Sequence, residues 1–194
     1  MRRLALIVLL LTATSQAAAA GRLATPDPRA MVLQLSDLPS TFVREEGRYV
    51  TNTVLDEEAA THKDFTKLGR LTGYYTVYTA IALGGLTAVS SFVSIYKLGS
   101  GAHDSLVQSV AEAKQQGGLV LEPRGGLAQL GSDARMYVQR TSQDGTKVDF
   151  FTLVWRHGHV FAEVMGAGIS GTVDPVQVIA LAKKQDGHID KILG

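Results

Sequence analysis

The chain has 194 residues, no cysteine, and 19 basic against 18 acidic residues, which gives a formal net charge of +1. Without cysteine it forms no disulfide, no thiolate nucleophile and no cysteine-ligated zinc or iron–sulfur site. Nucleic acids and anionic membranes recruit basic surfaces, so a charge this close to balance argues against both as partners.

The first twenty residues have the pattern of a cleavable secretory signal. Arg2 and Arg3 precede an apolar run from Leu4 to Leu11, and small residues follow up to residue 20. The run is shorter than the roughly 20 residues that span a bilayer, so we expect cleavage after Ala18 to Ala20. Without Arg2 and Arg3, 17 of the 19 basic residues remain against 18 acidic ones. The mature chain is therefore predicted to be secreted or in the cell envelope, without a membrane or lipid anchor.

The first half of the mature chain alternates between helix and strand signals. Residues 21–26 form a predicted linker, and a single domain is expected over 27–194. Asp27-Pro28 has the form of a helix cap and predicts a helix to residue 36. A strand over 42–50 and a helix over 53–67 follow. Segments 71–81 and 86–96 are rich in aromatic and β-branched residues and predict a hairpin.

The second half predicts a helix, three strands and a closing helix. Ser100 is the expected cap of a helix that ends at Gly117-Gly118. Strands are expected over 134–141, 147–156 and 159–166, and Asp174-Pro175 opens a helix to about residue 189. The order predicts an α+β fold with a largely antiparallel sheet of about five to six strands packed by helices.

Two short glycine turns set the expected alignment of the three-strand meander. Asp144-Gly145 and His157-Gly158 are dipeptides of the kind found in two-residue hairpin loops. As type I′ turns they place Tyr137 opposite Thr152 and Thr152 opposite Glu163, with Arg140 opposite Asp149 as an ion pair. One face of the meander is then a hydrophobic core face, built from Met136, Val138, Phe151, Leu153, Trp155, Val160, Ala162 and Val164.

The opposite face of the meander mixes apolar and polar side chains and is the candidate binding surface. Ligand sites are mostly apolar hollows with a few placed polar groups. The candidate ligand-binding residues are Arg135, Tyr137, Thr152, Phe161 and Glu163. An ordinary surface ion pair between Arg135 and Glu163, with Tyr137 at the rim, is the alternative.

Other motifs have simpler structural explanations. His157 and His159 are better explained as a turn residue and an exposed strand residue than as metal ligands. No Gly-x-Ser-x-Gly elbow, phosphate-binding loop or dinucleotide fingerprint occurs, so no catalytic residue, cofactor or metal is indicated. Tyr74, Tyr75, Tyr78, Phe92 and Tyr96 line an aromatic pocket or, in the favoured interpretation, pack within the sheet.

The stretch from Val148 to Ala182 resembles known secreted domains. Its strand end Trp155-Arg156-His157-Gly158, the Gly166-x-Gly168 break and the Asp174-Pro175 helix start are similar to the C-terminal half of PsbP-like and LpqN-like bacterial domains. They also resemble the extracellular sensor domain of mycobacterial receptor kinases, although the paired disulfides of that domain are missing. The resemblance implies an antiparallel sheet flanked by helices and a non-enzymatic binding or assembly module, and it transfers no functional residue.

Three functions follow as hypotheses. The favoured one is a secreted, monomeric, non-enzymatic module that binds an unknown small molecule or protein. The second is a secreted hydrolase with His159 or Glu163 as general base. The third is an assembly factor that presents an apolar patch around Phe150, Phe161 and Met165 to another protein.

Overall fold

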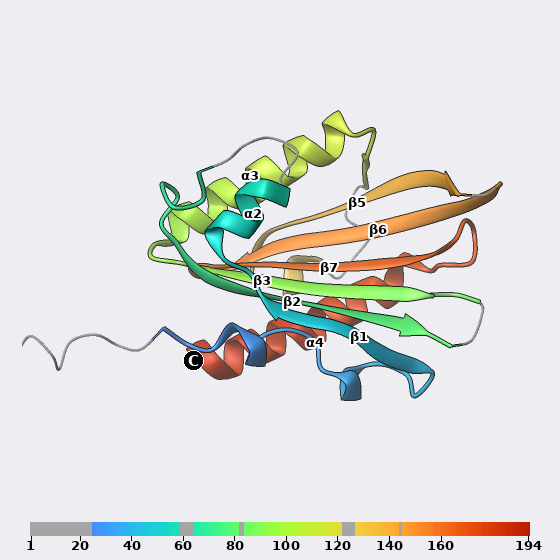
Figure 1. Ribbon diagram of the computed structural model, residues 1–194, viewed down its shortest axis with the longest axis horizontal. Coiled ribbons are helices and arrows are strands. Elements are labelled where there is room, and N and C mark those ends of the chain that lie inside the picture. Colours follow the sequence, from blue (N-terminus) through green and yellow to red (C-terminus); the bar gives the residue numbers. More distant parts are fainter. Residues whose placement is uncertain (1–24, 59–63, 82–83, 122–126, 144) are drawn as a thin grey trace, which may run out of the picture.

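The computed structural model describes residues 25–58, 64–81, 84–121, 127–143 and 145–194. The expected signal peptide, the first residues of the linker and Asp144 lie outside these ranges. A seven-stranded antiparallel sheet forms the middle layer, with α2 and α3 on one face and α4 on the other (Figure 1). The α+β class is confirmed, with one strand more than the upper expectation.

The strands are ordered β1-β2-β3-β7-β6-β5-β4 across the sheet. Six of them match the expected segments to within a few residues, and the short strand β4 is additional. Their bounds are β1 Phe42–Tyr49, β2 Arg70–Ala80, β3 Ala88–Tyr96, β4 Leu119–Leu121, β5 Ser132–Gln143, β6 Thr146–His157 and β7 Val160–Ile169.

Helix α4 (Pro175–Leu193) begins as the Asp-Pro pair predicts. The Asp174 side chain accepts a hydrogen bond from the Val176 amide at 2.9 Å, and Pro175 is the first helical residue. One stripe of the helix is buried on the sheet against Trp155, which is fully buried. The core therefore lies between α4 and the face that the sequence assigned to it, and all eight predicted core residues of the meander belong to this cluster.

The predicted helix over 27–36 is wrong. The segment forms two short 3-10 turns, η1 (Pro28–Ala30) and η2 (Leu35–Asp37), with extended chain between them. Met31, Val32 and Leu33 are all buried at 1% exposure or less. Three consecutive buried residues do not suit a helix at the surface, which turns only one face inward. The segment instead lies between α4 and the sheet as an extended strap.

Two other helix boundaries differ from expectation. Helix α2 spans only Asn52–Glu58, whereas a helix to residue 67 was expected; residues 59–63 lie outside the described ranges, and turns follow from residue 64. Helix α3 (Gly99–Gln115) begins one residue before Ser100, and its N-cap position is Leu98, which makes no side-chain cap. Ser100 is therefore inside the helix, and its expected role as a cap is wrong.

The expected register of the meander is confirmed between β5 and β6 and differs between β6 and β7. Tyr137 pairs with Thr152 and Arg140 with Asp149, with 3.1 Å between Arg140 Nε and Asp149 Oδ1. Thr152, however, pairs with Met165.

The predicted pairing of Thr152 with Glu163 is therefore wrong, and Glu163 lies opposite Val154. The loop between β6 and β7 is Gly158-His159, and Gly158 has a positive φ of 58° at its first position. This is the glycine placement of a type II′ turn and not of the expected type I′ turn. The loop lies one residue later than expected, so each residue of β6 pairs two residues further along β7. Because a shift of two residues preserves the alternation, each side chain stays on its expected face.

A buried polar junction joins the strap, the sheet and α4. The Ser91 hydroxyl donates to Gln185 Oε1 at 2.5 Å and accepts the Leu33 amide at 3.0 Å. Gln185 Nε2 donates to the Phe92 carbonyl at 3.0 Å. Neither Ser91 nor Gln185 is exposed to solvent, so the polar groups satisfy one another.

We expect Gln185→Ala to lower the free energy of unfolding by about 3 kcal/mol, because it leaves buried polar groups unpaired and opens a cavity. Urea unfolding followed by circular dichroism measures the change. Gln177→Ala, at an exposed position of the same helix, is the control and should change it by less than about 0.5 kcal/mol. Equal losses in the two variants would contradict a structural role for the junction.

Candidate functional site

Helix α3 covers one end of the sheet face that lies opposite α4. A second hydrophobic cluster forms beneath it, in which Ala102 and Leu106 of the helix pack with Tyr137, Val154 and Phe161 of the sheet. Burial and the nearby charge of Glu163 raise the pKa of the Tyr137 hydroxyl, which hydrogen-bonds with Thr152 and Ser109. This end of the face is therefore closed, whereas the other end has no helix over it (Figure 1).

A single row of side chains crosses this face from β1 to β5. Each member lies directly opposite the next on the neighbouring strand, so all of them point to the same side. The order across the sheet is Arg48, Tyr75, Phe92, Glu163, Val154 and Arg135.

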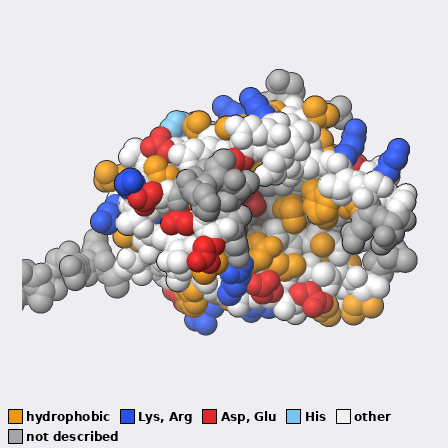
Figure 2. Space-filling view, turned by 45° about the horizontal axis from the view of Figure 1, so that its top comes forward, with side chains coloured by type: hydrophobic (Ala, Val, Ile, Leu, Met, Phe, Trp, Pro, Cys, Tyr) orange, Lys and Arg blue, Asp and Glu red, His pale blue; other side chains and the backbone are white. Residues whose placement is uncertain are grey.

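A pocket of about 490 Å³ opens over the first part of this row. Its floor is aromatic and its walls come from β1 and α2. Figure 2 shows hydrophobic side chains in a hollow on this face, with acidic and basic side chains at its border. The lining residues are Glu46, Arg48, Val50, Leu55, Tyr75, Phe92 and Glu163.

The Glu163 carboxyl is the chemically unusual group of the pocket. It stands on β7, at the middle of the sheet, between Phe92 and Val154. Within the described ranges, no hydrogen bond or ion pair reaches this carboxyl. Removal from water without a counter-ion disfavours the charged form, and burial raises the pKa of Glu163 to about 7.

The other charged groups of the pocket neutralise each other. Arg48 Nε lies 2.7 Å from Glu46 Oε1, and the Arg48 guanidinium lies 5.8 Å from the centre of the Tyr75 ring. Burial also raises the pKa of Tyr75, whose hydroxyl hydrogen-bonds with Ser90. The described part of the pocket thus combines an aromatic floor, an Arg48–Glu46 ion pair and one carboxyl, Glu163, that has no partner cation there.

The structure separates the five residues proposed from the sequence. Tyr137, Thr152 and Phe161 are buried beneath α3 or within the sheet, and only Glu163 lines the pocket. Arg135 is exposed and lines a different groove, between α3 and β5. Arg135 and Glu163 form no ion pair within the described residues, because β6 and its Val154 lie between the two strands.

Strand β1 belongs to the site, although no pattern in the sequence indicates this. Glu46 and Arg48 reach the pocket because β1 pairs with β2, and Tyr75 and Phe92 meet because β2 pairs with β3. Side chains alternate along β2, so Tyr75 points to the opposite face from Tyr74 and Tyr78. That alternation is the one sequence signal that places Tyr75 on this face.

The alternative of one aromatic pocket is wrong, and the favoured interpretation of packing within the sheet holds for Tyr74, Tyr78 and Tyr96, which are buried. Tyr74 and Tyr78 are buried in the core on the α4 side, whereas Tyr75 and Phe92 share the other face. Phe92 packs edge-to-face on Phe161 with ring centres 6.2 Å apart. The aromatic floor of the pocket is therefore continuous with the cluster beneath α3.

The His157-Gly158-His159 triplet lies away from the pocket. His157 Nδ1 is 3.0 Å from Asp186 Oδ1 on α4, and the same carboxyl oxygen accepts the Trp155 indole N–H at 2.8 Å. His159 is in the turn between β6 and β7. Within the residues that the structure describes, no three histidine, aspartate or glutamate side chains are grouped as a metal site.

Comparisons with known proteins give one structural relative. No family model matches the chain, and no curated protein sequence matches it. Among solved structures, the chain is similar to the extracellular domain of PknH from Mycobacterium tuberculosis. The TM-score is 0.48 and the identity 12%, over 84% of this chain and 98% of that chain. This is a weak similarity at the level of the fold, and the resemblance to PsbP-like and LpqN-like domains stays a prediction.

Among the described residues, no helix combines sufficient length with a sufficiently apolar sequence to cross a membrane.

The raised pKa of Glu163 predicts a specific pH dependence of stability. The folded chain holds this proton more tightly than the unfolded chain, whose carboxyl titrates near 4.5. The free energy of unfolding therefore falls as the pH rises from about 4.5 to about 7 and is level above that range. Glu163→Gln removes this loss, so we expect the variant to gain stability over wild type between about pH 5 and pH 8, by an amount of the order of 2 kcal/mol.

Denaturant unfolding of wild type and of Glu163→Gln at about pH 5 and at about pH 8 measures this difference in the free energy of unfolding. Asp104→Asn, which neutralises an exposed carboxyl on α3, is the control and should show the wild-type pH dependence. A constant difference between Glu163→Gln and wild type across the range would show that Glu163 titrates as an exposed carboxyl does.

Proposed function

We propose that this chain is a small-molecule-binding module, and that its site is the pocket over Tyr75, Phe92 and Glu163. The observation that carries the proposal is the Glu163 carboxyl, which lies in a half-buried position at the middle of the sheet with no counter-ion or hydrogen-bond donor in the described ranges. Holding a carboxyl there costs stability. Such a cost is common at binding sites, where the ligand supplies the missing partner.

The chemistry of the pocket favours a ligand that carries an ammonium group on an apolar body. A bound cation would stabilise the ionised form of Glu163, and the faces of Tyr75 and Phe92 would attract it further. Arg48 does not take this role, since its guanidinium is engaged with Glu46 and the Tyr75 ring. A volume of about 490 Å³ is within the range of small-molecule sites.

Export through the predicted signal peptide would place this site outside the cytoplasm. The signal pattern in the first twenty residues supports this location. We therefore propose an extracytoplasmic binding domain that acts without a cofactor.

A hydrolase is the second candidate, and one observation favours it. The pocket holds two carboxyls in different environments, Glu46 beside Arg48 and Glu163 without a cation. Carboxyl pairs with unlike environments perform acid–base chemistry in glycoside hydrolases. His159 does not line the pocket, so this candidate depends on Glu163. Release of 4-nitrophenol from a panel of 4-nitrophenyl glycosides by wild type, with none by Glu163→Gln, would favour the hydrolase over the binding module.

The assembly-factor hypothesis receives less support from the exposure of its residues. Phe161 is buried beneath α3, and Phe150 and Met165 are half-buried on the open end of the face. A continuous apolar patch of all three would need α3 to move.

We expect 2-phenylethylammonium to bind the pocket and 2-phenylethanol, its neutral counterpart, to bind at least about ten-fold more weakly, because only the amine supplies a counter-ion to Glu163. Titration followed by two-dimensional NMR gives both affinities and the residues affected. Glu163→Gln should lose the preference for the amine. Glu45→Gln, on the same strand as Glu46 but outside the pocket lining, should keep it. Equal affinity of wild type for amine and alcohol would refute the proposed ligand class.

A further inference from the structure

A second pocket of about 490 Å³ lies on the other side of the sheet, where the strap meets β1, β2 and the last turns of α4. It shares no lining residue with the pocket over Glu163. Its lining residues are Asp27, Arg29, Ala30, Val32, Leu33, Gln34, Arg44, Tyr74, Tyr78, His188, Lys191 and Ile192.

Positive charge predominates in this second pocket. Arg29, Arg44 and Lys191 reach it from three separate elements, and Asp27 is its one carboxylate. Asp27 is already engaged, since its oxygens accept the Tyr49 hydroxyl at 2.9 Å and pair with Arg29 at 3.3 Å. Within the described ranges, neither Arg44 nor Lys191 pairs with a carboxylate. The pocket therefore has two cationic groups available to a ligand.

Arg44 is held in place by hydrogen bonds to uncharged groups. Its Nη2 donates to the Tyr74 hydroxyl at 2.6 Å and its Nε to the Glu46 carbonyl at 3.3 Å. Gly47 makes room for this arrangement, because a Cβ at that position would overlap the Arg44 guanidinium. Within the described ranges, the Arg44 guanidinium therefore has only neutral hydrogen-bond partners, the Tyr74 hydroxyl and the Glu46 carbonyl.

A β-bulge in β1 sends Arg44 to this side of the sheet. The pairing register shifts between Arg44 and Glu46, so Arg44 lies opposite Tyr78 and Glu46 opposite Val77. In a regular strand, residues two apart share a face. The bulge therefore separates the arginine from the acidic residue that would otherwise stand beside it.

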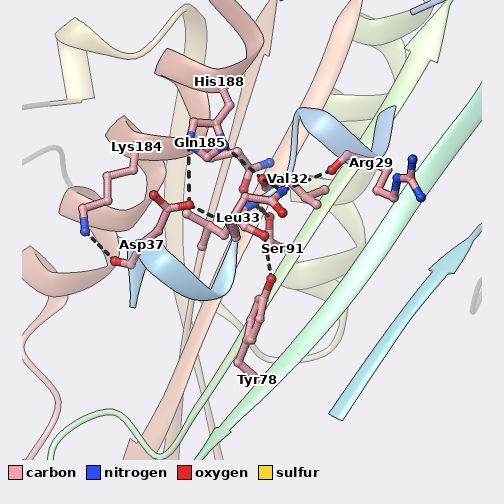
Figure 3. A network of polar contacts seen from close by, with 10 residues as sticks. Arg29, Val32, Leu33, Asp37, Tyr78, Ser91, Lys184, Gln185 and His188 are labelled. Atoms are coloured by element: carbon pink, nitrogen blue, oxygen red, sulfur yellow. Dashed lines mark hydrogen bonds and ion pairs between the residues drawn. The ribbon is translucent and has the colours of Figure 1, made fainter. Parts of the chain in front are cut away.

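The wall of the pocket is fixed by the contacts in Figure 3. The Tyr78 hydroxyl donates to the Leu33 carbonyl at 2.6 Å, and His188 Nδ1 lies 3.1 Å from the Val32 carbonyl. The Gln34 side chain donates to the carbonyls of Val32 and Arg29. Strap and α4 are thereby joined next to the pocket, which is preorganised for a ligand.

We propose that this second pocket binds a small organic anion, with its phosphate or carboxylate on Arg44 and Lys191 and its apolar body against Ala30, Tyr74 and Ile192. An arginine and a lysine that line the same pocket are a usual means of holding such groups. The volume exceeds what a bare anion needs, and the apolar lining residues suit the remainder of an organic molecule. The proposal is independent of the function assigned to the pocket over Glu163.

Phenyl phosphate, inorganic phosphate and phenol are the probes for this site, with NMR titration of the full mature chain as the measurement. We expect phenyl phosphate to shift resonances of Arg44, Tyr74 and His188, and to bind at least about ten-fold more tightly than either other compound. The binding should weaken between 50 and 200 mM salt, because opposite charges attract less when screened.

Arg44→Gln and Lys191→Gln should each weaken phenyl phosphate binding at least about five-fold, while Lys147→Gln, an exposed lysine on β6, leaves it unchanged. Gly47→Ala keeps every charge but displaces the Arg44 guanidinium, so it should weaken binding as well. The proposal would be overturned if phenol or inorganic phosphate bound as tightly as phenyl phosphate. It would also be overturned if neither Arg44→Gln nor Lys191→Gln changed the affinity for phenyl phosphate. A failure of 2-phenylethylammonium to bind the pocket over Glu163 would not affect this proposal for the second pocket.

Discussion

The buried junction of Ser91, Gln185 and Leu33 joins the strap, the centre of the sheet and α4. A single hydroxyl near the centre of β3 donates to α4 and accepts from the strap, so both elements are held at one point on the core. Gln185 also binds the carbonyl of Phe92, whose ring forms the floor of the pocket on the opposite face. Leu33 belongs to the wall of the basic pocket. The three hydrogen bonds of this junction thus connect elements that line both pockets.

The two pockets have opposite electrostatic character because the sheet separates them. Among the residues that the structure describes, Glu163 faces the α3 side without a cation beside it, and Arg44 faces the α4 side without a carboxylate beside it. The intervening layer is packed with apolar side chains, so neither group can neutralise the other. The bulge in β1 contributes directly to this separation, since it turns two charged neighbours to different faces.

The sequence predicted the layers of the molecule better than it predicted the site. Strand positions, the α4 cap and the division of the meander into two faces follow from alternation and local turn chemistry, and the structure confirms them. The partners of Glu163 depend on which residue of His157-Gly158-His159 occupies the first loop position, and a glycine on its own allows both answers. The meeting of Arg48, Tyr75 and Phe92 depends on long-range pairing of β1, β2 and β3, for which no local pattern gives the register. The strap was predicted as a helix because the Asp27-Pro28 cap is a local signal, whereas its burial is a property of the whole fold.

The two edge strands of the sheet, β1 and β4, determine how readily another chain could add a strand to it. β1 is exposed along most of its length and carries charged side chains at four of its eight positions, and its bulge interrupts the regular backbone ladder. At the far side of the sheet, β4 offers only three residues. Unpaired backbone of this kind is a poor template for a foreign strand. A chain that folds without disulfides would, in this way, be protected from amyloid-like stacking by the shape and charge of its own edge strands.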